Sequence, residues 1–145
     1  MKSYVGVKTV MAEPGKAKKD YGTHKAGEDG YRVVYPDGYE SWSPKDVFEK
    51  AYRESKGLSF GIAIEAMRSG KRVARAGWNG KNQYIELASN ISYTNSKGEV
   101  INANHDAIGN QAVAFVGTSG VQLGWLASQA DMLAEDWIIL DYNKE

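Results

Sequence analysis

The chain has 145 residues, with 18 basic and 18 acidic side chains and no cysteine. This length suits one domain or two small modules, and the balanced charge argues against a nucleic-acid polymer as partner. The absence of cysteine excludes disulfides and thiolate chemistry, and apolar runs too short to span a bilayer predict a globular protein without a membrane partner.

The first elements in chain order are a strand, a loop and a hairpin. Residues 4–10 alternate loosely and predict a strand, whereas the charged, glycine-rich residues 13–30 predict a loop. Residues 31–35 and 39–42 flank Pro36-Asp37-Gly38, a sequence with turn chemistry. Two apolar runs around such a turn predict a β-hairpin.

A short amphipathic helix is expected to follow this hairpin. Ser43 and Pro44 are the predicted N-cap and first helical residue. Trp42 is expected to be part of the core here. The apolar stripe of the helix comprises Val47, Phe48, Ala51 and Tyr52. Residues 1–56 are therefore predicted to form a small hairpin-plus-helix module.

The next segment predicts a capped helix and two strands. Ser59 is placed to cap the helix, and Gly70 to end it in the left-handed conformation. Residues 71–76 and 83–87 then read as strands joined by a turn. The apolar face of the helix comprises Phe60, Ala63, Ile64 and Met67.

The remainder of the chain predicts mainly strands. Residues 91–93 are expected to pair with residues 99–101, and residues 112–116 form another apolar strand. Residues 129–134 read as helical, and residues 137–140 read as a final strand with Trp137 in the core. Residues 57–145 are thus predicted to form a separate α+β domain with a mainly antiparallel sheet.

Arg75 stands apart within a run of basic residues. Residues 68–81 hold five basic and no acidic side chains, and residues 131–141 hold four acidic and no basic ones. If these segments are neighbours, solvated ion pairs of little energetic value are one interpretation. Arg75 shares a strand face with Val73 and is expected to point inward, where its charge needs a partner. Arg75 is therefore a candidate phosphate or carboxylate ligand.

The sequence predicts neither an enzyme nor a metal site. His24 and His105 are far apart, and no cysteine can complete a metal site, so no metal and no cofactor are predicted. His105-Asp106 reads as a surface pair. Residues 117–120 resemble part of a phosphate-binding loop but lack its lysine and following helix.

Trp78 and Trp125 occur beside glycines and short polar residues. One interpretation is that both cover the ends of a small core. The other is that each indole stacks on a nucleobase, a contact worth roughly 1–3 kcal/mol, while a nearby arginine meets a phosphate. The side chains suited to hydrogen-bond ribose or base edges are Asn79, Ser128, Gln129 and Asp131.

Three segments, residues 58–67, 70–81 and 125–137, closely resemble motifs of the second Thoeris anti-defence family of phage proteins, in the same order. The resemblance covers residues 58–140. It implies a non-enzymatic protein that sequesters glycocyclic ADP-ribose, the signal of bacterial TIR-domain proteins, so that the Thoeris effector stays inactive. It also implies cyclic dinucleotides of CBASS as further ligands, a homotetramer with pockets where subunits meet, and action in the host cytoplasm.

The resemblance assigns roles to particular residues. It points to Trp78 and Trp125 as base-stacking walls. It places Phe60 and Gly61 near the pocket at the start of the capped helix, where backbone N–H groups favour anions. Polar contacts are expected from Asn79, Ser128, Gln129 and Asp131, whereas Arg75 is a candidate from its strand position. Residues 1–56 lie outside the resemblance, and an accessory or oligomerisation role is expected for them.

Two other functions stay open from the residues alone. A hydrolase of ADP-ribose-type nucleotides would use Asp131 or Glu135 as acid or base. A phage structural or assembly protein would bind no small molecule and would present a partner surface on the hairpin module.

Overall fold

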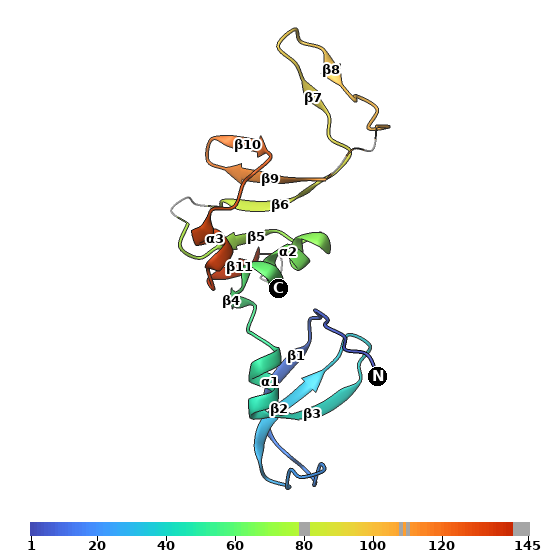
Figure 1. The fold of residues 1–145 in the computed structure, drawn as a ribbon, viewed down its shortest axis with the longest axis vertical. Coiled ribbons are helices and arrows are strands. Elements are labelled where there is room, and N and C mark those ends of the chain that lie inside the picture. The colour runs from blue at the N-terminus through green and yellow to red at the C-terminus, as the bar shows by residue number, and fades with distance from the viewer. Residues whose placement is uncertain (79–81, 108, 110, 141–145) are drawn as a thin grey trace. The chain divides into compact units, whose positions relative to one another are not determined.

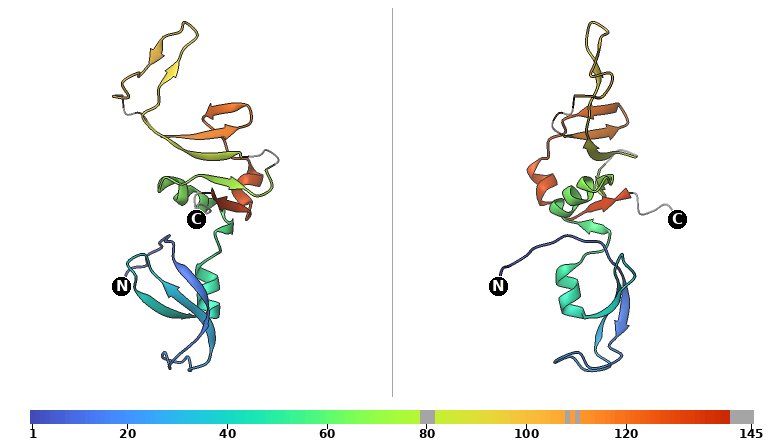
Figure 2. Two further views of the ribbon diagram at one scale, coloured as in Figure 1. Left: turned by 180° about the vertical axis from the view of Figure 1, so that it is seen from behind. Right: turned by 90° about the vertical axis from the view of Figure 1, so that its right-hand side faces the viewer.

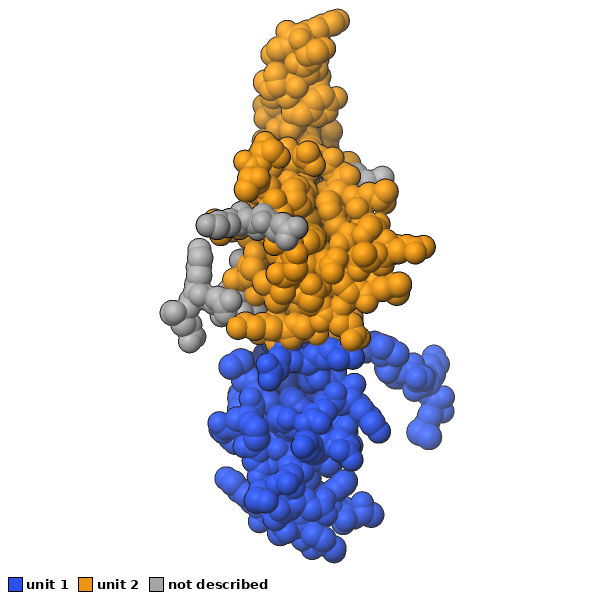
Figure 3. Space-filling model, turned by 90° about the vertical axis from the view of Figure 1, so that its left-hand side faces the viewer, with its two compact units in different colours: residues 1–54 blue, residues 55–145 orange. Residues whose placement is uncertain are grey.

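The computed structural model describes residues 1–78, 82–107, 109 and 111–140. The chain forms two compact units, Met1–Glu54 and Ser55–Glu145, which Figure 3 shows in different colours. Each unit has its own antiparallel sheet and at least one helix. No helix in the described part of the chain is long and apolar enough to cross a membrane.

The first unit is a three-stranded antiparallel sheet with one short helix (Figure 1). β1 (Met11–Lys16), β2 (Asp29–Val34) and β3 (Glu40–Pro44) lie in that order, and α1 (Lys45–Ala51) follows β3 directly. The predicted hairpin around residues 36–38 and the helix after it are both confirmed. Both signals are local, because turn residues and a helical apolar stripe act over a few consecutive positions.

The predicted strand at residues 4–10 is wrong. That segment carries no regular secondary structure, and the strand begins at Met11 and runs into the predicted loop. Distant partners set this pairing, since Gly15 lies opposite Gly30 and its carbonyl accepts a 2.9 Å hydrogen bond from the indole of Trp42. A Cβ at Gly30 would meet the Trp42 ring at 2.6 Å. Packing across the sheet therefore decides where this strand forms, and local alternation does not.

The predicted start of α1 is wrong by one residue. Pro44 is the N-cap instead of the first helical residue, with extended backbone angles, and no side chain caps the helix. Pro44 still pairs with Gly30 in the sheet, so extended backbone continues through Pro44. Trp42 is half-buried, and its ring stacks on Tyr21 with 5.3 Å between ring centroids.

The second unit contains a six-stranded antiparallel sheet in the order β10-β9-β6-β5-β11-β4 (Figure 2). A separate two-stranded sheet and two helices complete it, so the unit is α+β and mainly antiparallel, as predicted. The elements are β4 (Lys56–Leu58), α2 (Phe60–Arg68), β5 (Val73–Arg75), β6 (Tyr84–Ala88), β7 (Tyr93–Thr94), β8 (Val100–Ile101), β9 (Ala112–Gly117), β10 (Gly120–Leu123), α3 (Gln129–Leu133) and β11 (Trp137–Ile139).

The two strands that the sequence does not predict, β4 and β10, are the edge strands of this sheet. All four residues of β10 are exposed, and the strand begins at Gly120 with φ +112°. Strands of three and four residues are too short for an alternating pattern to identify them, although Val121 and Leu123 do alternate with Gln122 in β10. The β7–β8 pairing, predicted from residues 91–93 and 99–101, is confirmed by the pairs Tyr93–Ile101 and Thr94–Val100.

α2 begins and ends as its sequence predicts. The hydroxyl of Ser59 accepts a 3.4 Å hydrogen bond from the amide of Ile62, and Gly70 has φ +85° just beyond the helix. The helix buries Ala63 and Met67 against the sheet. The core that it covers includes Leu58, Val73, Ile85 and Trp137, so the predicted core position of Trp137 is confirmed.

Replacing Ser59 by alanine is expected to lower the free energy of unfolding of the second unit by about 1 kcal/mol, because the first turn of α2 loses its side-chain acceptor. Ser59→Asp keeps an acceptor and adds a favourable charge at the helix start, so its stability is expected to stay near that of the wild type. Urea unfolding followed by tryptophan fluorescence measures both. Identical midpoints for Ser59→Ala and the wild type would contradict the cap.

Candidate functional site

Aromatic side chains of the second unit gather around Trp137, which is 0% exposed. Its ring centroid lies 5.4 Å from that of Phe60, 5.5 Å from that of Trp78 and 6.3 Å from that of Trp125. Phe115 joins the cluster through Trp78 at 5.9 Å. Tilted and edge-to-face pairs at such separations are favourable beyond the area they bury. The cluster therefore links α2, two turns and the sheet.

Trp78 and Trp125 contact each other directly. Their centroids are 6.1 Å apart and their planes meet at 61°, an edge-to-face arrangement. Both rings are half-buried. This contact occupies the facing sides of the two rings.

Backbone hydrogen bonds hold each indole beside the sheet. The amides of Gly124 and Trp125 both donate to the carbonyl of Val113 at 3.0 Å, and Gly124 has φ +89°. The amide of Trp78 donates to the carbonyl of Arg75 at 3.2 Å. The glycine next to Trp125 is thus needed for the turn that brings the ring back onto β9.

Arg75 points inward and meets two acidic partners. Its Nε donates to Oδ1 of Asp136 at 2.9 Å, and its Nη1 donates to Oδ1 of Asp131 at 3.0 Å. The other oxygen of Asp136 accepts the amide of Gly77 at 3.2 Å. Hydrogen bonds from Arg75 hold the pKa of Asp136 below its ordinary value despite partial burial. The inward arginine thus ties β5 to β11 and to α3.

Asp131 is occupied on both carboxylate oxygens. Its Oδ2 accepts the amide and the hydroxyl of Ser128 at 2.9 and 2.8 Å, which forms a capping box at the start of α3. Burial by itself raises the pKa of Asp131. The hydrogen bonds from Ser128 and from Arg75 lower this pKa by more than burial raises it, so the net shift is downward. Its carbonyl accepts the indole N–H of Trp137 at 3.0 Å. Asp131 is therefore ionised and fixed by its hydrogen bonds, and an ionised carboxylate has no proton to donate as a general acid.

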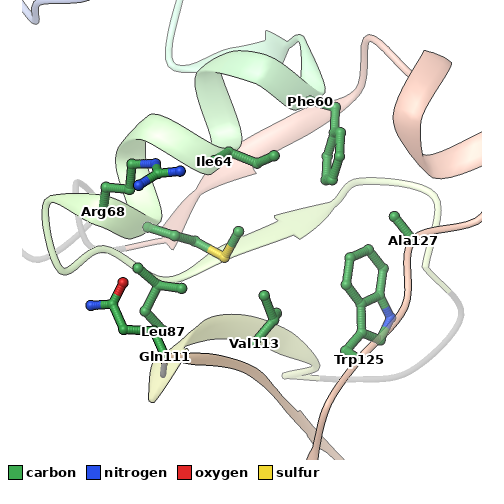
Figure 4. Close-up of a pocket in the computed structure, with 9 residues that line it drawn as sticks. Phe60, Ile64, Arg68, Leu87, Gln111, Val113, Trp125 and Ala127 are labelled. Atoms are coloured by element: carbon green, nitrogen blue, oxygen red, sulfur yellow. The ribbon is translucent and has the colours of Figure 1, made fainter. Parts of the chain in front are cut away.

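A pocket of about 360 Å³ lies between α2, β6, β9 and the chain after β10 (Figure 4). Two of the predicted residues, Phe60 and Trp125, line it. The lining residues that sequence analysis does not assign to a site are Ile64, Met67, Arg68, Leu87, Gln111, Val113 and Ala127. Ile64 and Met67 are on the predicted apolar face of α2. The apolar periodicity of the helix therefore identified these two residues, but as core residues and not as pocket residues.

The pocket has an aromatic end and a polar end. In Figure 4 Phe60, Trp125 and Ala127 lie at one end, and Arg68 and Gln111 lie at the other. Apolar side chains form the floor between them. A volume near the lower end of the usual range of ligand pockets, about 300–1,000 Å³, suits a small ligand or one part of a larger one.

The other predicted site residues that the structure describes lie outside this lining. Gly61 is exposed next to Phe60, and Gln129 is exposed at the first position of α3. Asn79 lies outside the described residues. Trp78 is part of the aromatic cluster, and a hydrogen-bonded network of Arg75, Ser128 and Asp131 reaches the cluster through the bond from the Trp137 indole to the Asp131 carbonyl. Within the described ranges no group of three or more His, Cys, Asp or Glu side chains is placed to hold a metal ion.

Comparisons with known proteins match the second unit. A family model described as the Thoeris anti-defense 2-like domain matches residues 58–140. The protein named Thoeris anti-defense 2 of Bacillus phage SP01 is 39% identical over 88 residues. That alignment covers 57% of this chain and 94% of the phage protein.

Proposed function

We propose that this chain, which belongs to the Thoeris anti-defense 2-like family, counters Thoeris defence. In this proposal it acts by binding and sequestering glycocyclic ADP-ribose. The name of the phage relative supports the anti-defence part of this proposal. The pocket beside Phe60 and Trp125 is the observation that carries the part about binding a nucleotide signal.

The aromatic end of the pocket suits a nucleobase. Base stacking on an aromatic side chain is worth about 1–3 kcal/mol and needs no particular base. Trp125 is held by its own backbone and by the rings of Phe60, Trp78 and Trp137, so little ordering is required when a ligand arrives. A site of this kind is largely formed before binding, which favours tight capture.

The surroundings of the pocket also suit a protein that leaves its ligand intact. Asp131, the acid nearest in sequence to Trp125, is ionised and bonded to Ser128 and Arg75. A hydrolase would need an acid or base poised for proton transfer. We therefore propose sequestration without degradation.

The proposal includes self-association. The chain just before and after Trp125 exposes large apolar side chains, a composition typical of subunit contacts. We propose a homotetramer acting in the host cytoplasm, with cyclic dinucleotides of CBASS as further ligands. The exposed side chains are Val121, Leu123, Leu126, Met132 and Leu133.

Isothermal titration calorimetry with glycocyclic ADP-ribose tests this function. A saturable heat at micromolar protein is expected, and the ligand is expected to be recovered unchanged after the complex is heated. The absence of any heat would rule out the proposed signal. Recovery of a cleaved product would indicate the hydrolase instead.

A further inference from the structure

We propose that Arg68 and Gln111 form an anion subsite at the polar end of the pocket, which binds a phosphate group while Phe60 and Trp125 hold a base. This inference rests on the proposed function, because it assigns the two ends of the same pocket to two parts of a nucleotide. It names Arg68, and not Arg75, as the arginine that meets the ligand.

Arg68 is placed to reach a ligand. It is the last residue of α2, and its side chain lines the pocket beside Ile64 (Figure 4). Its ion pair with Glu65 is long, with 3.8 Å between Nε and Oε1, and the two side chains are 64% and 50% exposed. Exposed pairs of this kind are worth little, so exchanging Glu65 for a phosphate costs little.

The neighbouring arginines are engaged elsewhere. Arg75 donates to two aspartates at 2.9 and 3.0 Å, and both bonds would break if it turned to a phosphate. Arg72 lies 3.6 Å from Glu86 and stacks over the ring of Tyr84, outside the pocket lining. Of these three arginines only Arg68 lines the pocket.

The separation of the two ends fits a nucleotide. Phe60 and Arg68 are the first and last residues of α2, and eight residues of helix rise about 12 Å. A base, its sugar and a phosphate extend over a comparable span. In Figure 4 Val113 lies between the two ends, and Met67 also lines the pocket, so the floor offers apolar contact and leaves the charge recognition to the polar end.

Gln111 adds a group that can both donate and accept. It precedes β9 and faces the same end of the pocket as Arg68 (Figure 4). A guanidinium and an amide at the same end of a pocket can each donate to an oxygen of one phosphate, and a charge-assisted hydrogen bond to an anion is about twice as strong as one between neutral groups. The subsite therefore selects for ligands that join a base to an anion.

The test compares Arg68→Ala with Arg72→Ala. The second variant removes the same charge four residues later in the chain, at a side chain that does not line the pocket. Calorimetry with glycocyclic ADP-ribose and with AMP is expected to show affinities about tenfold lower for Arg68→Ala and within about twofold of wild type for Arg72→Ala. The affinity of Arg68→Ala is also expected to depend less on salt, since an ion pair with the ligand is lost.

The possible outcomes separate the subsite from the function. If the wild type binds glycocyclic ADP-ribose and the two variants behave alike, the subsite is wrong and the proposed function stands. If the wild type binds AMP and not glycocyclic ADP-ribose, the proposed signal is wrong. If the wild type binds neither nucleotide, both the subsite and the function are wrong. Circular dichroism of Arg68→Ala, an exposed position, is expected to match that of the wild type and confirms that a lost affinity is not lost folding.

Discussion

Replacing Arg75 by methionine is expected to lower the free energy of unfolding of the second unit by about 3 kcal/mol, because two partly buried carboxylates lose their shared cation. Asp131 and Asp136 have side chains 14% and 35% exposed, and Arg75 is 23% exposed. Urea unfolding followed by tryptophan fluorescence measures the change. The loss also loosens the anchor that holds α3 near Trp125, so ligand affinity is expected to fall with stability.

Arg72→Met is the matched control, since it removes the same charge three positions earlier in the chain. Its partner Glu86 is 35% exposed and Arg72 itself is 48% exposed, so a loss below about 1 kcal/mol is expected. Equal losses for the two variants would show that general charge, and not the Arg75 network, stabilises the unit.

The same network predicts the pH dependence of stability. The pKa values of Asp131 and Asp136 are lower in the folded chain than in the unfolded chain. Each contributes stability that is complete above the unfolded value, about 3.9, and is lost as the pH falls through the folded value. The difference between wild type and Arg75→Met is therefore expected to shrink below about pH 4. A difference that stays constant to lower pH would contradict the assignment.

Features set by a few consecutive residues were predictable from sequence. The cap at Ser59, the stop at Gly70 and the hairpin around residues 36–38 each follow from the conformations that those residue types favour. The inward direction of Arg75 followed from strand alternation. That its partners are Asp131 and Asp136 depends on which strands are neighbours, which the sequence offered only as one interpretation.

Features set by distant packing were not predictable. The strand expected at residues 4–10 has no partner strand, and β10 forms only because β9 is beside it. The pocket shows the same limit, because α2 presents one apolar stripe that contributes both to the core and to the pocket lining. Met67 is 2% exposed and still lines the pocket. A single periodicity cannot divide such a stripe between two surfaces.

Replacing Trp125 by alanine is expected to lower the affinity for glycocyclic ADP-ribose by roughly ten- to a hundredfold, because the aromatic end of the pocket loses its largest ring. Trp125→Phe keeps an aromatic face and is expected to retain more of the affinity than the alanine variant. Calorimetry measures both, and gel filtration checks that the oligomer survives. An unchanged affinity in Trp125→Ala would place the ligand elsewhere.

Two further substitutions test this result. Tyr93→Ala changes an aromatic side chain that is 56% exposed and does not line the pocket, so it is expected to leave affinity near that of the wild type. Trp78→Ala is expected to lower affinity at least about tenfold, since its ring contacts Trp125 edge-to-face with 6.1 Å between the ring centroids. Because Trp78 also contacts the buried Trp137, its loss is expected to reduce stability as well. A drop in affinity with no drop in stability would instead mean that Trp78 touches the ligand itself.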